Sequence, residues 1–179
     1  MNIKGLTLIE LLVVISIIVI ASGAVVLNGS SSKSDVELLN TKNLIISNIS
    51  RAKEMALSGV GATLNTNYGI GVWFPDSAGG YYYIYRNNET AVAEKGCDIC
   101  ASAVPSTDVI IEKITLPDGI KYTRVGSNYG VLFTPPTPHV AICTSPTACT
   151  AGPLFELDIV KKSGGTAQRI KVNKAGLIE

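Results

Sequence analysis

The sequence predicts an α+β protein in which a long hydrophobic N-terminal helix precedes a globular antiparallel β-sheet or β-sandwich domain. Three observations predict this class. Residues 6–27 are almost entirely apolar, residues 34–58 repeat apolar side chains at helical spacing, and from Tyr68 onward apolar and polar residues alternate between glycine-containing turns. One helix followed by a run of strands is typical of α+β domains. Residues 59–179 are therefore expected to form the β-rich globular domain.

The charge of the 179-residue chain is nearly balanced, with 15 basic and 14 acidic residues. A nucleic-acid-binding protein usually has a basic excess gathered on one face, and a net charge of +1 gives no sign of one. Hydrophobic residues make up 46% of the chain and charged residues only 16%, which is a low charged fraction for a soluble domain. Much of the hydrophobic excess lies at the N-terminus.

Residues 6–27 are long enough to form a membrane-spanning helix. At about 1.5 Å per residue they extend roughly 33 Å, which is enough to cross the apolar core of a bilayer. Lys4 precedes the segment and places the N-terminus in the cytoplasm, because cytoplasmic flanks are usually basic. We therefore expect a single-pass protein of the inner (cytoplasmic) membrane, in contact with lipid, whose globular domain lies outside the cytoplasm, in the periplasm or at the cell surface.

Glu10 is the one charged residue in this segment. A carboxylate inside a bilayer costs about 3 kcal/mol on insertion scales, so such residues usually have a partner and a function. Simpler interpretations are a secretory signal cleaved among the small residues 21–24, a plain membrane anchor, or a Glu10 that lies at the headgroup level. A plain anchor explains the length and Lys4 but does not explain Glu10.

The segment Lys4–Ile15 has the sequence KGLTLIELLVVI and closely resembles the class III signal of type IV pilins and pseudopilins. The resemblance implies that a prepilin peptidase cuts between Gly5 and Leu6 and methylates Leu6, so that residues 1–5 are a leader peptide. It also implies that the Glu10 carboxylate pairs with the N-terminal amine of a neighbouring subunit, which offsets the desolvation of both charges and sets the register of a filament. Leu6 departs from the phenylalanine that is commoner at this position.

Residues 28–58 are expected to combine a linker with the amphipathic second part of the N-terminal helix. Residues 28–34 are rich in glycine and serine, which leaves two interpretations open: a flexible joint, or a helix that runs through it. Ser34 and Glu37 have the spacing of a capping box, and Gly59 ends the helix. Apolar residues that share one side of this helix are expected to face a core: Leu38, Leu39, Ile45, Ile46, Ile49, Ala52, Met55 and Ala56.

Strands are predicted where the pattern has a period of two. The tyrosines at positions 81–83 and 85 belong to half-buried sheet surface rather than to a ligand platform. Residues 134–153 are rich in threonine and proline and are predicted to be an irregular surface loop, either a partner contact or a disulfide-tethered spacer. The predicted strands are residues 68–74, 81–86, 109–116, 129–134, 155–160 and 167–172.

The order of these elements gives a finer resemblance, to the GspH/FimT-type minor pseudopilins, in which several strands also follow a long helix. The segment Arg51–Ala56 resembles the end of that family's helix, and Arg169–Ile178 resembles its last strand and hairpin. An ordinary pilin is the other candidate.

Four cysteines lie in the C-terminal half of the chain, at Cys97, Cys100, Cys143 and Cys149. The five residues between the second pair are too many for half of a zinc ribbon, and the first pair lacks the strand-to-helix context of a redox motif, so no metal is predicted. Outside the cytoplasm thiols usually oxidise, which favours structural disulfides. Local pairs, Cys97–Cys100 and Cys143–Cys149, are preferred, and crossed pairs remain open.

No catalytic site and no cofactor are predicted. His139 is the only histidine, it is expected in an exposed loop, and no nucleophile, Walker-type loop or paired carboxylates accompany it. The chain is therefore not expected to be an enzyme, although an uncleaved membrane-anchored enzyme is a third hypothesis.

The predicted function is that of a structural subunit, a minor pseudopilin or minor pilin, in a type II secretion-like or type IV pilus filament. Its expected partners are prepilin peptidase, other pilin or pseudopilin subunits, an inner-membrane assembly platform and membrane lipid. The alternatives are a major pilin, or a DNA-uptake (competence) minor pilin that binds nucleic acid through C-terminal basic strands. That basic cluster consists of Lys161, Lys162, Arg169, Lys171 and Lys174. The preferred interpretation is that these charges prevent aggregation through an exposed edge strand.

Overall fold

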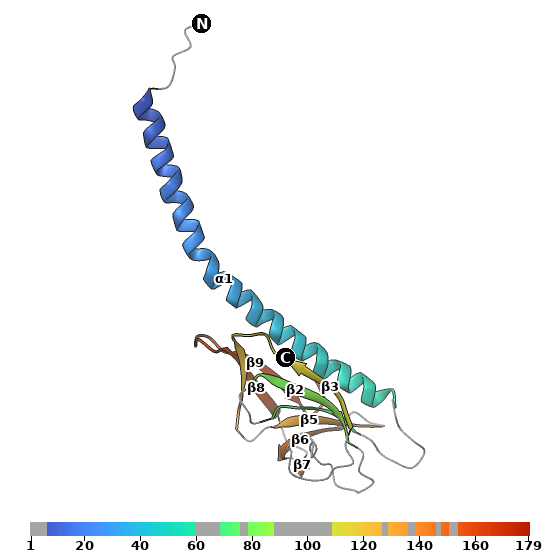
Figure 1. Cartoon of the computed structure of the whole chain (residues 1–179). Coiled ribbons are helices and arrows are strands. Elements are labelled where there is room, and N and C mark those ends of the chain that lie inside the picture. The colour runs from blue at the N-terminus through green and yellow to red at the C-terminus, as the bar shows by residue number, and fades with distance from the viewer. Residues whose placement is uncertain are drawn as a thin grey trace. The chain divides into compact units, whose positions relative to one another are not determined.

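The structure is a computed structural model that describes residues 7–59, 69–75, 79–87, 109–126, 129–135, 139–145, 148–150 and 154–179. The chain divides into two compact units, residues 1–37 and residues 38–179. A single helix, α1, covers Leu8–Leu57, and all described strands follow it (Figure 1). The predicted α+β class is therefore confirmed.

The helix α1 is continuous through residues 28–34, which resolves the choice between a flexible joint and a helix that runs through. Ser34 consequently lies inside the helix and is not its N-cap, so the capping box predicted for Ser34 and Glu37 is wrong. Serine and asparagine cost well under about 1 kcal/mol each in a helix, and a single glycine about 1 kcal/mol. A continuous backbone ladder also avoids four unsatisfied N–H groups at a new helix start.

The strands of the second unit form two antiparallel sheets (Figure 1). The six-stranded sheet has the order β3-β2-β1-β5-β6-β7, and the three-stranded sheet has the order β4-β8-β9. The strands are β1 (Ile70–Trp73), β2 (Tyr81–Arg86), β3 (Val109–Thr115), β4 (Ile120–Arg124), β5 (Gly130–Thr134), β6 (His139–Ser145), β7 (Ala148–Thr150), β8 (Leu154–Lys161) and β9 (Gln168–Asn173).

The segment predicted to be an irregular loop, residues 134–153, instead contains strands β6 and β7, and that prediction is wrong. His139 opens β6 opposite Thr134 of β5, so it is not a loop residue. The strand was missed because Val140, Ala141 and Ile142 are all buried, which removes the polar alternation expected of a strand with one wet face. The short strand β4, which follows the Asp118–Gly119 turn, was also missed.

One face of α1 packs into a core that both sheets share. Ile45, Ile49 and Ala52 are fully buried there, together with strand residues such as Val72 and Leu157. The predicted apolar stripe is therefore mostly correct. Leu39 is the exception, because it is 48% exposed.

Phe74 joins the two sheets within this core. Its ring stacks on Tyr82 of the large sheet at 5.3 Å between centroids and on Phe155 of the small sheet at 5.7 Å. Tyr122 of the small sheet meets it edge-on at 5.2 Å. Such aromatic contacts contribute about 0.5–1.5 kcal/mol each beyond area burial, so Phe74 fixes one sheet against the other.

A buried hydrogen bond ties α1 to β2. Asn48 is 7% exposed, and its Nδ2 donates to the hydroxyl of fully buried Tyr82 at 2.7 Å. Burial raises the pKa of Tyr82 to about 12, from its ordinary value of 10.0. Both polar groups are thereby satisfied in an apolar core, where an unpaired one would cost about 1–3 kcal/mol.

The other face of the six-stranded sheet carries a second, smaller core. Trp73, Tyr85 and Leu132 are buried on it. Glycines lie beneath the rings: a Cβ on Gly71 would meet the Tyr85 ring at 2.6 Å, and one on Gly130 would meet Trp73 at 3.1 Å. The predicted half-buried tyrosine surface is correct only in part, because positions 81 and 83 are half-buried while positions 82 and 85 are fully buried.

Replacing Ile49 with alanine should lower the free energy of unfolding by about 2–5 kcal/mol, because it leaves a cavity in the shared core. Leu44→Ala is the matched control on the same helix, where Leu44 is 43% exposed; it should change stability by no more than about 0.5 kcal/mol. Chemical denaturation of the detergent-solubilised full chain measures both. Equal losses in the two variants would contradict the packing of α1.

The raised pKa of Tyr82 predicts that the folded state loses stability in alkali. Between pH 10.0 and about 12 the unfolded chain releases this proton while the folded chain keeps it, so stability falls as pH rises. The slope from this one group is at most about 1.4 kcal/mol per pH unit. Tyr82→Phe should lack this component, and denaturation at about pH 9 and about pH 11 compares the two chains. A constant difference between them would count against the raised pKa.

Candidate functional site

The first turn of α1 contains a capping box formed by Thr7 and Glu10. The backbone N–H and the hydroxyl of Thr7 both donate to Glu10 Oε2, each at 2.9 Å, and the backbone N–H of Glu10 donates to Thr7 Oγ1 at 3.4 Å. This reciprocal arrangement is how threonine and glutamate three residues apart satisfy orphan donors at a helix start. Sequence reasoning selected Glu10 but missed Thr7, although the Thr-x-x-Glu spacing was the available signal.

The capping box lies entirely on the C-terminal side of the predicted cleavage point. It uses the backbone N–H of Thr7, which belongs to the peptide bond with Leu6, and so it needs none of residues 1–5. The predicted processing residues Gly5 and Leu6 themselves lie outside the described residues. A chain cleaved after Gly5 would keep Thr7 as the intramolecular hydrogen-bond partner of the Glu10 carboxylate.

The helix segment around and after Glu10, residues 8–20, exposes large apolar side chains on all sides. Their exposed fractions run from 48% at Val14 to 83% at Leu8. A helix that is hydrophobic all round normally lies in a membrane or in the core of a larger assembly. The exposed residues are Leu8, Ile9, Leu11, Leu12, Val13, Val14, Ile15, Ile17, Ile18, Val19 and Ile20.

The hydroxyl of Ser16 donates to the backbone oxygen of Leu12 at 2.8 Å, so this polar group is satisfied within the helix. No helix among the described residues combines the length and the apolar character needed to cross a membrane.

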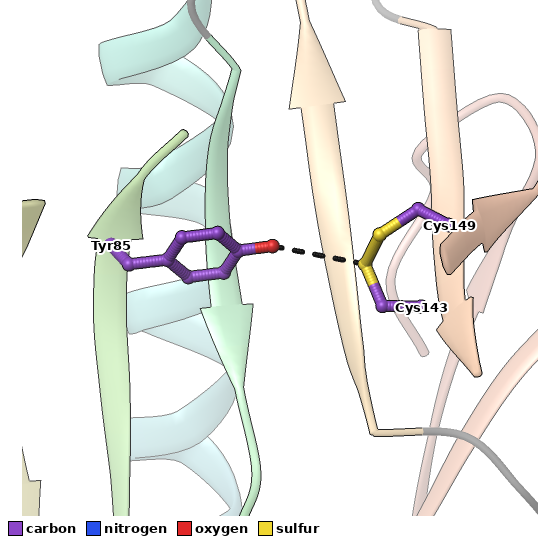
Figure 2. The surroundings of a disulfide bond; sticks show 3 residues. All are labelled: Tyr85, Cys143 and Cys149. Atoms are coloured by element: carbon purple, nitrogen blue, oxygen red, sulfur yellow. Dashed lines mark hydrogen bonds between the residues drawn. A yellow bond between two sulfur atoms is a disulfide. The ribbon is translucent and has the colours of Figure 1, made fainter. Parts of the chain in front are cut away.

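A disulfide joins β6 to β7 within the second, smaller core of the six-stranded sheet. Cys143 and Cys149 are directly opposite each other, with Cα atoms 3.9 Å apart. Figure 2 shows the Tyr85 hydroxyl of β2 pointing at the Cys143 sulfur, 3.7 Å away. The bond is one of the local pairs preferred from the sequence, whereas Cys97 and Cys100 lie outside the described residues.

The basic cluster near the C-terminus is partly neutralised by acids on the neighbouring strand. Arg169 of β9 donates from Nε and Nη2 to the two carboxylate oxygens of Asp158, at 2.7 and 2.9 Å. Lys171 lies 3.5 Å from Glu156, and Arg169 lies 3.7 Å from the same carboxylate. The cross-strand register, in which each of these cations opposes an acid of β8, produces the pairing.

Residues 1–26 match the model of the prokaryotic N-terminal methylation motif. No curated protein and no solved structure matches the chain. The motif supports a type IV pilin-like protein that a prepilin peptidase processes and that assembles with other pilin subunits.

Removing the disulfide with the pair Cys143→Ala and Cys149→Ala should lower the free energy of unfolding by about 2 kcal/mol, because the short loop between them is no longer closed in the unfolded chain. Tyr85→Phe is the matched control. It removes the hydroxyl contact but keeps the bond, and should cost less than about 1.5 kcal/mol. Denaturation of the full chain measures both effects, and an unchanged double variant would refute a stabilising role.

Proposed function

We propose that this chain is a structural subunit of a pilin-like filament, namely a GspH/FimT-type minor pseudopilin of a type II secretion-like system or a minor pilin of a type IV pilus. The observation that carries the proposal is the N-terminal methylation motif over residues 1–26. The role is assembly rather than catalysis. No cofactor is assigned.

The exposed apolar segment of α1 supports this role because it needs a non-aqueous environment. Burying a large aliphatic side chain contributes roughly 1.5–3 kcal/mol, and residues 8–20 expose many of them. In the proposed cycle, lipid of the inner membrane surrounds this segment before assembly. Neighbouring subunits replace the lipid in the filament core.

Glu10 has a defined starting state in this cycle. In the single chain its carboxylate accepts two hydrogen bonds from Thr7. In the proposed filament it pairs instead with the methylated amine of Leu6 on a neighbouring subunit. The exchange replaces two hydrogen bonds from neutral donors with an ion pair, which offsets the desolvation of both charges in an apolar filament core and favours the assembled register.

The proposed location is the inner membrane, with residues 59–179 outside the cytoplasm. The disulfide between Cys143 and Cys149 supports this topology, because such bonds persist in oxidising compartments. Prepilin peptidase, other filament subunits and an inner-membrane assembly platform are the proposed partners.

The alternative of DNA uptake through the C-terminal basic strands receives less support. Arg169 and Lys171, which occupy the middle of that cluster, are engaged with Asp158 and Glu156. A cation that is already paired with a carboxylate contributes little to the free energy of binding a phosphate. Nothing in the described geometry favours a major pilin over a minor one.

The intact mass of the full chain, expressed with and without an active prepilin peptidase, tests the proposal. With peptidase, the mass should show loss of residues 1–5 and gain of one methyl group on Leu6. Gly5→Val should stay uncut because it alters the cleavage residue. Gly23→Ala is the matched control and should be cut normally, since a Cβ at Gly23 meets nothing within 4 Å. An uncut wild-type chain beside active peptidase would refute the proposal.

Glu10→Gln separates processing from assembly. The variant keeps the shape of the side chain but loses its charge, so we expect normal cleavage and at least a tenfold loss of incorporation into filaments, corresponding to about 1.4 kcal/mol. Sedimentation of sheared filaments measures incorporation. Normal incorporation would exclude a charge pair at Glu10.

A further inference from the structure

A groove of about 560 Å³ lies between α1 and the turn that follows β9. Two large apolar side chains are exposed at this groove: Leu57 of α1 is 47% exposed, and Leu177 of the turn is 56% exposed. The described lining residues are Ile46, Ser50, Lys53, Glu54, Leu57, Ala175, Gly176, Leu177 and Ile178.

The turn that forms one wall of the groove is held in place by hydrogen bonds. The side-chain oxygen of Asn173 accepts from the backbone N–H of Ala175 at 2.9 Å and from that of Leu177 at 3.0 Å. Lys53 of α1 donates from Nζ to the carbonyl of Gly176 at 2.9 Å. Gly176 has a φ of 71°, a left-handed conformation that glycine adopts without steric cost. Leu177 is therefore presented at the groove by an ordered backbone.

A second exposed apolar surface lies on β3, which is an edge strand of the six-stranded sheet. Val109, Ile110 and Ile111 are 39%, 37% and 42% exposed. Proteins usually protect edge strands by shortness, charge or a covering segment, because such strands can pair with another chain. The other described edges are protected in these ways: β7 has three residues, β4 exposes only polar side chains, and β9 is covered by the backbone pairing of Lys171 with Glu179.

The groove and β3 lie on opposite flanks of α1, within the unit of residues 38–179. Arg51 forms an ion pair with Glu112 of β3, whereas Lys53 reaches the turn after β9. At 3.6 residues per turn, positions 51 and 53 point roughly 160° apart around the helix. A contact between the groove of one copy and β3 of another could therefore be repeated from copy to copy.

We propose that β3 of a second copy of this chain docks in the groove, so that the copies associate head to tail. The inference rests on the proposed filament function and adds to it a contact between globular domains. One contact of this kind covers an exposed strand and an exposed groove at the same time.

The charges of the two surfaces are complementary. Glu54 is exposed at the groove and has no ion-pair partner among the described residues, whereas β3 carries the exposed Lys113, whose ammonium lies 4.2 Å from the Tyr81 ring centroid. Ile111 lies on the same face of β3 as Lys113. On α1, Leu57 follows Glu54 by three residues and is its neighbour on the helix surface. Each surface thus has an apolar and a charged side chain close together, with opposite signs of charge.

A symmetric contact between two copies fits these surfaces less well. In such a dimer both copies use the same patch, so the other patch of each copy stays exposed. A contact between two different patches instead leaves a free groove at one end and a free strand at the other, and further copies can add there.

Charge reversal at Glu54 and Lys113 tests the contact in the full chain, expressed with active prepilin peptidase. Glu54→Lys alone, or Lys113→Glu alone, places like charges in every contact, so we expect at least about a tenfold loss of the chain from sedimented sheared filaments. When the two variants are expressed together, every contact in an alternating array again joins a cation to a carboxylate, and sedimentation should return to within about twofold of wild type. The double variant Glu54→Lys/Lys113→Glu should recover in the same way.

The matched control is Lys121→Glu, which reverses an exposed lysine on β4 outside both surfaces and should change sedimentation by less than about twofold. Normal sedimentation of either single variant would overturn the proposal. A loss that neither the mixture nor the double variant restores would also overturn it, in favour of a strand from a different protein as the occupant. Intact mass separates the two proposals: a wild-type chain that is cleaved but does not sediment refutes the head-to-tail contact alone, whereas an uncleaved chain refutes the proposed function.

Discussion

The fold of residues 38–179 depends on the burial of one face of α1 in the core that the two sheets share. Ala52 and Ala56 are small enough for the helix to approach closely, and Ile45 and Ile49 fill the core at the preceding turns of the helix. Neither sheet can cover its own inner residues, because a sheet with one apolar face must pack on another layer. The Asn48–Tyr82 hydrogen bond then selects one arrangement, since a rotated helix would leave two buried polar groups unpaired. Surface contacts such as the ion pair of Arg51 with Glu112 add little to this.

The N-terminal part of α1 needs a different environment from the part that packs on the sheets. In residues 38–56 the apolar side chains lie on one face, as they do in helices that cover a sheet. In residues 8–20 they lie on every face and remain exposed in the single chain. The capping box of Thr7 and Glu10 provides a defined helix start in this segment without any contribution from residues 1–5. One continuous helix therefore joins a part stabilised by its own sheets to a part that requires other molecules around it.

The sequence predicted the elements that have one buried face and one more exposed face. It did not predict the elements that are buried on both faces. Strand β8 was found because Phe155, Leu157 and Ile159 are buried while the residues between them are half-buried. Strand β6 was missed because both of its faces are buried, so threonine and proline in the flanking segment dominated the pattern. At the candidate site, Glu10 could be selected because a charge in an apolar run is conspicuous. Thr7 was missed because the Thr-x-x-Glu spacing, although present in the sequence, was not interpreted there as a capping box.

Charge is the property for which sequence order was the poorest guide. Lys161, Lys162, Arg169, Lys171 and Lys174 lie close in sequence and suggested one basic surface. The antiparallel register of β8 and β9 places acids opposite two of them and removes much of their field. The same register directs Asp158 toward Arg169 and away from β4. The strand register, rather than net charge or closeness in sequence, therefore decides which of these cations lie opposite an acid.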